Sequence, residues 1–385
     1  MSIEVSGTVE PGFEPVAEAF AQGFADRPTM GAALHVLVEG RSVVDLWAGI
    51  ADERSGRAWT RQTPTVVFSC TKGLVSILAA RLVAEGRLDY DAPVAHYWPE
   101  FAQAGKGRVT VGQALAHQAG LSAPRADLSE DDLVDWDRMA AVLATQEPLW
   151  PLGSGYAYHA LTHGWLVGEI IRRVTSKSVG AYFRELVTAP LGVDAWIGLP
   201  ESVSESTAHL QVSSPLAALW AEEAGKPAPN WPHRAMTLGR ALPDALVTDD
   251  GGFNSERIRA AEIPGAGGVA TAEALAVIWS ATVTPTRGIR LIDDKVIVEA
   301  TQTQSTGISV FGGDPPYSRW GYGFQLGSDA RLLLSERSFG HDGAGGQVGF
   351  ADPERRLGFG YVTNWMMGRE DQRATQIIAA LRKLV

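Results

Sequence analysis

Several residue types are scarce in this sequence, and each shortage excludes a class of protein. Cysteine occurs once, at Cys70, which excludes an internal disulfide framework and a cysteine-ligated zinc site. We interpret Cys70 as a small buried residue. The net charge is −11 and no run of lysine and arginine occurs, so nucleic acid and anionic membrane surfaces are poor partners. No apolar run reaches about 18 residues, and no basic segment followed by an apolar stretch opens the chain. These shortages predict a cytoplasmic protein that binds neither nucleic acid nor membranes.

The chain also lacks the Gly-x-Ser-x-Gly pattern, which excludes the serine hydrolases that place their nucleophile on an α/β-hydrolase elbow. Lysine is scarce, with six residues against 27 arginines, and only Lys72 has a serine, Ser69, three positions before it. On a helix these two residues share a face, so the hydroxyl and the amine can touch. A desolvated lysine with a lowered pKa can take the proton of a serine and turn it into a nucleophile.

The sequence that follows this pair distinguishes a site from an ordinary surface contact. On a polar helix, a serine near a lysine would simply be solvated. Residues 74–83 are instead apolar almost all round, which is typical of a buried helix. A lysine at the start of a buried helix needs a partner, and Ser69 is the nearest candidate.

Hydrophobic residues make up 45% of the chain and charged residues 20%, which is typical of a soluble globular protein with a large core. Hydrophobic periodicity and turn residues predict regular structure at both ends. The predicted helices are Glu14–Phe24 and Asp371–Leu384, and the predicted strands are Ala33–Val38, Val43–Ala48, Gly346–Ala351 and Leu357–Val362. From Glu201 to Asn254 the pattern is weak and Pro, Gly and Ala are frequent, so we expect irregular lid or loop material there.

Strands at both ends with helix-rich sequence between them predict an α+β fold, an α/β sandwich. We expect one antiparallel sheet built from both termini and flanked by helices, with an inserted, mainly helical subdomain. A single domain then spans residues 1–385. Its sheet-containing part covers approximately 1–70 and 265–385, and its helical part approximately 71–264.

Two further stretches stand out. Residues 150–160 form a loop punctuated by Pro and Gly that runs into a predicted helix at Leu161–Ile171, and a tyrosine just before such a helix can hold its phenol at the rim of an insertion. Residues 339–346 read Phe-Gly-His-Asp-Gly-Ala-Gly-Gly and lead straight into a predicted strand. Glycines there allow a ligand or another backbone to approach the strand edge closely.

Together with Ser69 and Lys72, these stretches resemble the serine β-lactamase and penicillin-binding-protein superfamily, in which Ser-x-x-Lys is a known signature. Within it the chain is most similar to the class C β-lactamase-related esterases, the family VIII carboxylesterases. Residues 66–74, 86–101, 109–121 and 189–192 also resemble that group. The similarity runs over roughly 15–200 and 265–365 and is weakest between 201 and 260. It implies a β-lactamase-like fold and acyl transfer through a covalent serine ester.

Carried over residue by residue, the resemblance makes Ser69 the nucleophile, Lys72 its partner and Tyr158 the tyrosine of the second motif. That motif is Tyr-x-Asn in the lactamases, whereas the third residue here is Ala160, so the asparagine that helps hold a β-lactam amide is missing. Tyr156 is a rival for the same role, but it fits the register of the motif less well.

The third motif, Lys-Thr-Gly in the lactamases, falls on His341-Asp342-Gly343. A neutral imidazole is a poorer anchor for the carboxylate of a penicillin than lysine, although it can still donate a hydrogen bond. We expect His341 to gain a proton, and to act partly like that lysine, around pH 6–7. The resemblance also assigns an oxyanion hole to the backbone N–H groups of Ser69 and Ala344, the residue after Gly343.

These departures favour hydrolysis of short uncharged esters, with no metal or organic cofactor. Lys72 and Tyr158 share the removal of the Ser69 proton, and which of them is the base stays open at this point. Three alternatives also stay open: a β-lactamase or D-alanyl-D-alanine peptidase, an acyltransferase of the same fold, and a non-enzymatic penicillin-recognition protein. Such a recognition protein would be expected to have lost Lys72 or Tyr158.

Other residues carry weaker signals. His159 and His163 are four residues apart, but no acidic residue or third histidine is spaced to complete a metal site with them, so we expect them to pack. Three tryptophans, Trp150, Trp320 and Trp365, are candidates to line an acyl pocket, although aromatic residues near a site are more often plain packing. We interpret Asn364, after the last predicted strand, as a turn residue.

Overall fold

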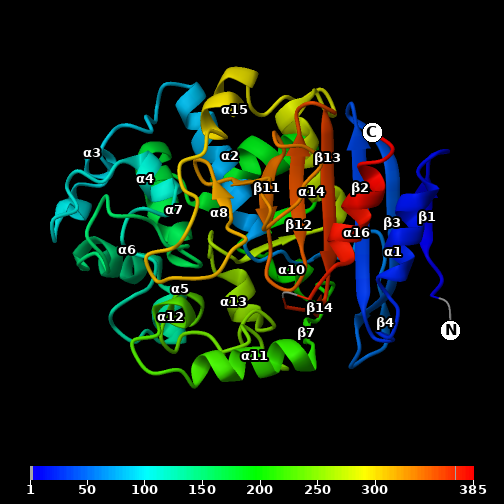
Figure 1. Cartoon of the computed structure of the whole chain (residues 1–385), viewed down its shortest axis with the longest axis horizontal. Helices are drawn as coiled ribbons and strands as arrows, with labels where there is room; N and C mark the ends of the chain where they lie inside the picture. The colour runs from blue at the N-terminus through cyan, green and yellow to red at the C-terminus, as the bar shows by residue number, and fades with distance from the viewer. Residues whose placement is uncertain (1–2, 369) are drawn as a thin grey trace.

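The computed structural model describes residues 3–368 and 370–385. Its central sheet is antiparallel and follows the order β1-β3-β2-β13-β12-β11-β10-β9, with β4 paired to β3 (Figure 1). The strands are β1 (Ser6–Val9), β2 (Gly31–Val38), β3 (Arg41–Asp52), β4 (Arg57–Ala58), β9 (Arg319–Trp320), β10 (Gln325–Leu326), β11 (Phe339–Asp342), β12 (Val348–Asp352) and β13 (Leu357–Thr363). The two ends of the chain meet where β2 pairs with β13, so the predicted α+β fold with a sheet built from both termini is confirmed.

Alternation along β2 explains why helices cover both faces of the sheet. Leu34 and Val36 point to one core, beneath α1 (Glu14–Gln22) and α16 (Arg373–Leu381), and Leu37 points to the other. Figure 1 shows α1 and α16 side by side on the outer face, although they lie at opposite ends of the sequence. Each helix buries an apolar stripe, as its periodicity predicted.

On the inner face, α14 (Ala272–Val283) packs directly against β13 and β12. The approach is close because β13 carries Gly358 and Gly360 on this side. A Cβ at Gly358 would lie 2.2 Å from the carbonyl oxygen of Ala276, and one at Gly360 would lie 2.4 Å from that of Ala272. Both distances are shorter than van der Waals contact, so glycine is required for the helix to lie this near the sheet.

The predicted buried helix is α2 (Cys70–Ala84), and it packs against β11 and α7 (Thr162–Thr175). Almost every residue from Cys70 to Leu82 is buried, which agrees with its lack of a polar face. The Cys70 thiol donates to the carbonyl oxygen of His341 at 3.1 Å, so Cys70 is a small buried residue that joins the helix to the sheet.

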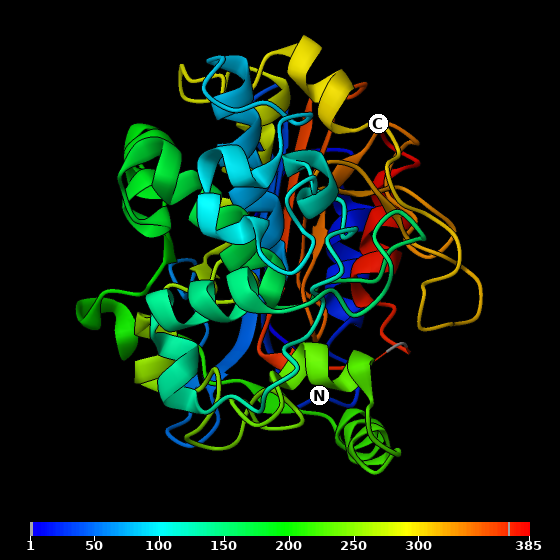
Figure 2. The same cartoon turned by 90° about the vertical axis from the view of Figure 1, so that its left-hand side faces the viewer.

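Many of the remaining helices lie to the left of the sheet in Figure 1, with α15 at the top and α11 at the bottom, and Figure 2 views the molecule from that side. The remaining helices are α3 (Val94–Tyr97), α4 (Val111–Leu115), α5 (Glu130–Val134), α6 (Trp136–Thr145), α8 (Val179–Phe183), α9 (Ala189–Leu191), α10 (Glu201–Ser204), α11 (Ser214–Ala224), α12 (Trp231–Thr237), α13 (Glu256–Ala260) and α15 (Asp294–Ala300), with short 3₁₀ and π turns at Pro99–Ala102 and Arg184–Thr188. Two small sheets complete the fold. The first has the order β5 (Thr65–Val66), β8 (Gly268–Ala270), β6 (Ala195–Ile197), and the second pairs β7 (Gln211–Val212) with β14 (Trp365–Met366). The predicted boundaries of the two parts of the domain stay a prediction.

The expectation of irregular structure between Glu201 and Asn254 is wrong in part, because this stretch contains α11 and α12. Both helices carry a proline in the first turn, where the missing N–H costs nothing and the fixed φ angle suits a helix. The proline that weakened the helical pattern in the sequence is therefore a start signal.

Asn364 lies at the bend between β13 and β14, and it also has a structural role there. Its side chain is fully buried and accepts from Gly31 N at 2.8 Å. It donates to the carbonyl oxygens of Ile50, Ala51 and His209 at 3.0, 3.2 and 3.0 Å. It joins β2, β3 and the segment before β7, which come together only in the folded chain.

Across residues 3–368 and 370–385, no helix has both the length and the apolar character needed to cross a membrane.

Candidate active site

Ser69 lies at the amino end of α2, directly after a strained turn. Strand β5 pairs with β8 and leads into Phe68, whose φ of +44° is in the left-handed region. Thr71 stabilises this turn, because its hydroxyl donates to the Phe68 carbonyl at 2.5 Å and accepts from Gly268 N at 2.9 Å. A strained backbone held by its neighbours is common where a reactive side chain must be presented.

Lys72 is fully buried, and its amine lies within hydrogen-bond distance of three oxygens. Nζ is 2.9 Å from Ser69 Oγ, 2.5 Å from the carbonyl oxygen of Ala160 and 2.7 Å from that of Gly265. Burial removes the ammonium group from water and holds the pKa of Lys72 well below its usual value. The structure therefore brings the two residues of the Ser-x-x-Lys pair into contact and favours the neutral amine.

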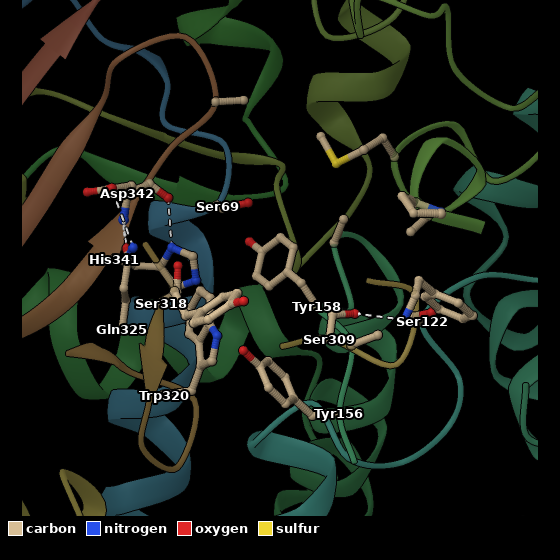
Figure 3. A pocket seen from close by; sticks show the side chains of 18 of the residues that line it. Ser69, Ser122, Tyr156, Tyr158, Ser309, Ser318, Trp320, Gln325, His341 and Asp342 are labelled. Carbon is tan, nitrogen blue, oxygen red and sulfur yellow. Dashed lines mark hydrogen bonds between the residues drawn. The ribbon is translucent and has the colours of Figure 1, made fainter. Parts of the chain in front are cut away.

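Tyr158 lies on the irregular segment before α7, and its hydroxyl is turned toward Ser69 (Figure 3). Lys72 Nζ is 4.9 Å from the centre of its ring. Burial raises the pKa of Tyr158, and the hydrogen bond with Ser69 offsets only part of that rise. The side chain is therefore a phenol at neutral pH.

Tyr156 lines the same cavity, but its hydroxyl donates to the carbonyl oxygen of Gly307 at 2.8 Å. Its pKa is raised by burial. The contacts with Ser69 and Lys72 belong to Tyr158, which agrees with the register chosen from the sequence.

His341 lies near the end of β11 and lines the cavity, and the centre of its ring is 6.1 Å from that of Tyr158. Its Nδ1 donates to the carbonyl oxygen of Asp342 at 2.7 Å, so Nε2 carries a lone pair. Burial, together with the smaller effect of the Lys72 charge, lowers the pKa of His341 to about 3. The expectation that His341 gains a proton around pH 6–7 is therefore wrong, because packing of three segments around the ring removes it from water.

Gly343 brings the third motif against the strand that precedes Ser69. A Cβ at this position would lie 2.3 Å from the carbonyl oxygen of Val67, so no larger residue fits. Gln347 completes this contact by accepting from Gly343 N through its backbone carbonyl at 2.7 Å and donating from its side chain to Val66. Ala344, the residue that follows, lines the cavity together with Ser69.

The backbone N–H groups of Ser69 and Ala344 donate to no protein acceptor among the described residues, and both residues line the cavity. Both amides are therefore available to a bound oxyanion, and their assignment as an oxyanion hole stays a prediction.

The cavity around these residues has a volume of about 550 Å³. Its lining includes Pro232, Ala235 and Met236 of α12. Trp320, Gln325 and His341, labelled in Figure 3, also line it. Of the three candidate tryptophans, only Trp320 lines it, and its ring stacks on that of Tyr158 at 5.1 Å. Trp150 packs behind the wall against Phe311, and Trp365 belongs to the core beneath α16.

The described lining of the cavity includes no lysine or arginine besides the buried Lys72 beneath it. Its one carboxylate is Asp342, which contacts Arg331 Nε at 2.9 Å and approaches Gln325 on the other side. Sequence reasoning did not find this pair, because Arg331 precedes the motif by ten residues in an irregular segment.

His159 and His163 each bind backbone groups. The His159 ring contacts the carbonyl oxygen of Ala157 at 2.7 Å and accepts from Leu121 N at 3.1 Å, and the His163 ring contacts the carbonyl oxygen of Leu115 at 3.2 Å. Within the described ranges no group of three or more His, Cys, Asp or Glu side chains is placed to hold a metal ion.

Comparisons with known proteins agree with this arrangement. A family model described as Beta-lactamase matches residues 16–383. The chain is 34% identical to the esterase/beta-lactamase LipL of Mycobacterium tuberculosis over 370 residues, which cover 94% of this chain and 83% of that protein. Among solved structures, a family VIII carboxylesterase shares 36% identity with a TM-score of 0.88 and covers all of both chains. A penicillin-binding protein homologue from Caulobacter crescentus shares 37% identity with a TM-score of 0.87, covering 99% of this chain and all of that one. The chain therefore belongs to the β-lactamase family, as its three motifs predicted.

Proposed function

We propose that this protein is a serine carboxylesterase that cleaves short uncharged esters through an acyl-Ser69 intermediate. The observation that carries the proposal is the buried Lys72 amine, 2.9 Å from Ser69 Oγ at the floor of a largely apolar cavity. Relatives that share about a third of the sequence are an esterase/beta-lactamase and a family VIII carboxylesterase, which supports the same chemistry.

The contacts of Lys72 favour it as the base. A neutral amine has two N–H groups and one lone pair, and the carbonyl oxygens of Ala160 and Gly265 can only accept. Both N–H groups are then used, and the lone pair faces the Ser69 hydroxyl. Tyr158 is the poorer base, because burial raises its pKa and keeps the phenol protonated.

Acylation then follows from these positions. Ser69 Oγ attacks the ester carbonyl carbon while its proton passes to Lys72 Nζ, and the oxyanion accepts from the N–H groups of Ser69 and Ala344. As the tetrahedral intermediate collapses, the bond to the alcohol oxygen breaks and the Tyr158 phenol protonates the leaving alkoxide. Tyr158 recovers its proton from Lys72. Water repeats the sequence on the acyl ester, releasing the acid and free Ser69.

The preference for uncharged esters rests on the charges around the cavity. A substrate carboxylate would find no lysine or arginine in the described lining, a neutral His341 and the carboxylate of Asp342. An unpaired charge in a poorly solvated cavity is costly. An uncharged ester avoids that cost.

A panel of p-nitrophenyl esters from acetate to decanoate, assayed beside nitrocefin, tests the proposal. We expect the highest kcat/KM for the short esters, a much lower value for nitrocefin, and no turnover of either by Ser69→Ala. Equal turnover of nitrocefin and p-nitrophenyl butyrate by the wild type would overturn the ester preference. Persistent ester hydrolysis by Ser69→Ala would overturn the mechanism.

A second activity is favoured by one observation. The LipL relative is named as both an esterase and a beta-lactamase, and an acyl-Ser69 intermediate could form from either substrate. Slow hydrolysis of nitrocefin that disappears in Ser69→Ala would place this side activity in the same site.

A further inference from the structure

We propose that His117 is the positioning residue of Tyr158. It accepts hydrogen bonds from the backbone N–H groups of the residues before and after Tyr158, an arrangement called the bracket below. The inference rests on the function proposed above. His117 follows α4, and its side chain is fully buried. His117 lies outside the three motifs.

The bracket consists of two hydrogen bonds. Ala157 N donates to the carbonyl oxygen of His117 at 3.2 Å, and His159 N donates to Nδ1 of the His117 ring at 3.2 Å. The N–H groups of Ala157 and His159, the residues before and after Tyr158, therefore both donate to His117. The segment from Gly155 to His159 belongs to no helix or strand, so these bonds replace the ones that regular structure would supply.

The ring of His117 also bounds the ring of Tyr158. The two centroids are 4.9 Å apart, and Trp320 lies edge to face with His117 at 4.8 Å while stacking on Tyr158 at 5.1 Å. Contacts on the backbone and on the ring together leave Tyr158 one direction for its hydroxyl, toward Ser69. Small misplacements of a reacting group are costly for catalysis.

The bracket requires the neutral form of His117 with the proton on Nε2, because Nδ1 must accept from His159 N. The titratable groups around the ring are His159, His163, Lys72 and His341. Burial, together with the positive charges these groups would carry, holds the pKa of His117 well below its usual value. The acceptor is thus present throughout the neutral pH range.

The backbone of His117 is left-handed, with a φ of +65°. This conformation turns the carbonyl and the ring to the same segment, and asparagine is among the residues that tolerate it best. The amide oxygen of asparagine is bonded to Cγ, as Nδ1 of histidine is, so His117→Asn can keep the acceptor. His117→Gln moves the amide one bond farther and keeps the bulk but loses the acceptor position. His117→Ala removes both.

The experiment compares these three variants by kcat, KM and thermal unfolding. We expect His117→Asn to keep kcat within about threefold, and His117→Gln and His117→Ala to lose about 10²-fold in kcat, with KM changed little. Equal losses in the Asn and Gln variants would overturn the bracket. Should His117→Ala fail to fold, the comparison between Asn and Gln still decides.

A double-mutant cycle separates positioning from general destabilisation. In a Tyr158→Phe background, with single-turnover acylation by excess enzyme as readout, His117→Gln should cost less than about threefold, because the group it positions is already absent. A loss of about 10²-fold in that background as well would overturn the inference. If Tyr158→Phe alone keeps full activity, the proposed role of Tyr158 fails, and that outcome is distinct from failure of the bracket.

Discussion

The Lys72 amine lies 2.9 Å from the Ser69 hydroxyl oxygen, one helical turn away on α2. Two carbonyl oxygens from distant parts of the chain, at Ala160 and Gly265, hold the same nitrogen. The helix therefore sets the spacing between Ser69 and Lys72, and two other segments set the orientation of the Lys72 amine. In the mechanism proposed above, the neutral amine then directs its lone pair at the hydroxyl before any substrate binds.

Labelling should place the acyl group on Ser69. After reaction with a fluorophosphonate, mass spectrometry is expected to find the adduct on the peptide that contains Ser69, because no other serine within residues 3–368 and 370–385 contacts a buried lysine amine. Ser122 also lines the cavity and serves as the internal comparison. An adduct on Ser122 would contradict the assignment.

Lys72 and Tyr158 should act as one unit. We expect Lys72→Ala, Tyr158→Phe and the double variant each to lose roughly 10³-fold or more in kcat/KM, with the double variant hardly worse than either single one. The matched control is Tyr156→Phe, whose hydroxyl binds the Gly307 carbonyl instead, and its loss should stay below about tenfold. Strictly additive losses, or a larger effect at Tyr156, would refute the shared proton relay.

His341→Lys should raise the activity on nitrocefin relative to p-nitrophenyl butyrate, because it supplies the cation that the described lining of the cavity lacks. His341→Gln, which stays neutral, is the control. In the wild type the ratio of the two activities should be constant from pH 8 to pH 5, because the pKa of His341 is about 3. A ratio that rises through pH 6–7 would show that the ring is more accessible to water than its contacts indicate.

The free energy of unfolding should fall as the pH drops below about 6.5. Burial lowers the pKa of His341 to about 3 and that of His159 to about 4, and it lowers the pKa values of His117 and His163 as well. Between these values and about 6.5 the unfolded chain binds protons that the folded chain does not. Each such histidine then contributes about 1.4 kcal/mol of lost stability per pH unit.

Urea unfolding at pH 7.5, 6.0 and 5.0 measures this loss. His341→Gln should reduce the change in the free energy of unfolding per pH unit by the contribution of one histidine. His96→Gln, at an exposed position, is the control and should leave that change as it is in the wild type. Stability that is flat between pH 7.5 and 5.0 would mean that these histidines are protonated in the folded protein.

Local patterns were sufficient for the parts of this protein that depend on neighbours in sequence. The three-residue spacing from Ser69 to Lys72 places both on one helix face whatever the rest of the fold, and the short β-rich runs Ala33–Val38 and Leu357–Val362 mark strands. From such patterns the sheet formed by both termini was predicted correctly, whereas the role of Tyr158 came from the family resemblance and stays a prediction. The irregular reading of Glu201–Asn254 was wrong in part, because a proline at a helix start looks like a helix breaker until the flanking turn is known.

Tertiary structure decided the protonation states and the partners. The pKa values of Lys72 and His341 depend on how much water surrounds each group, and that is set by segments more than 80 residues away in sequence, such as Ala160 beside Lys72. The bracket of Tyr158 by His117, the stack of Trp320 and the network of Asn364 likewise join residues that no local period relates. Hydrogen bonds and desolvation act over a few ångströms in space, so their effects appear only once the chain has folded.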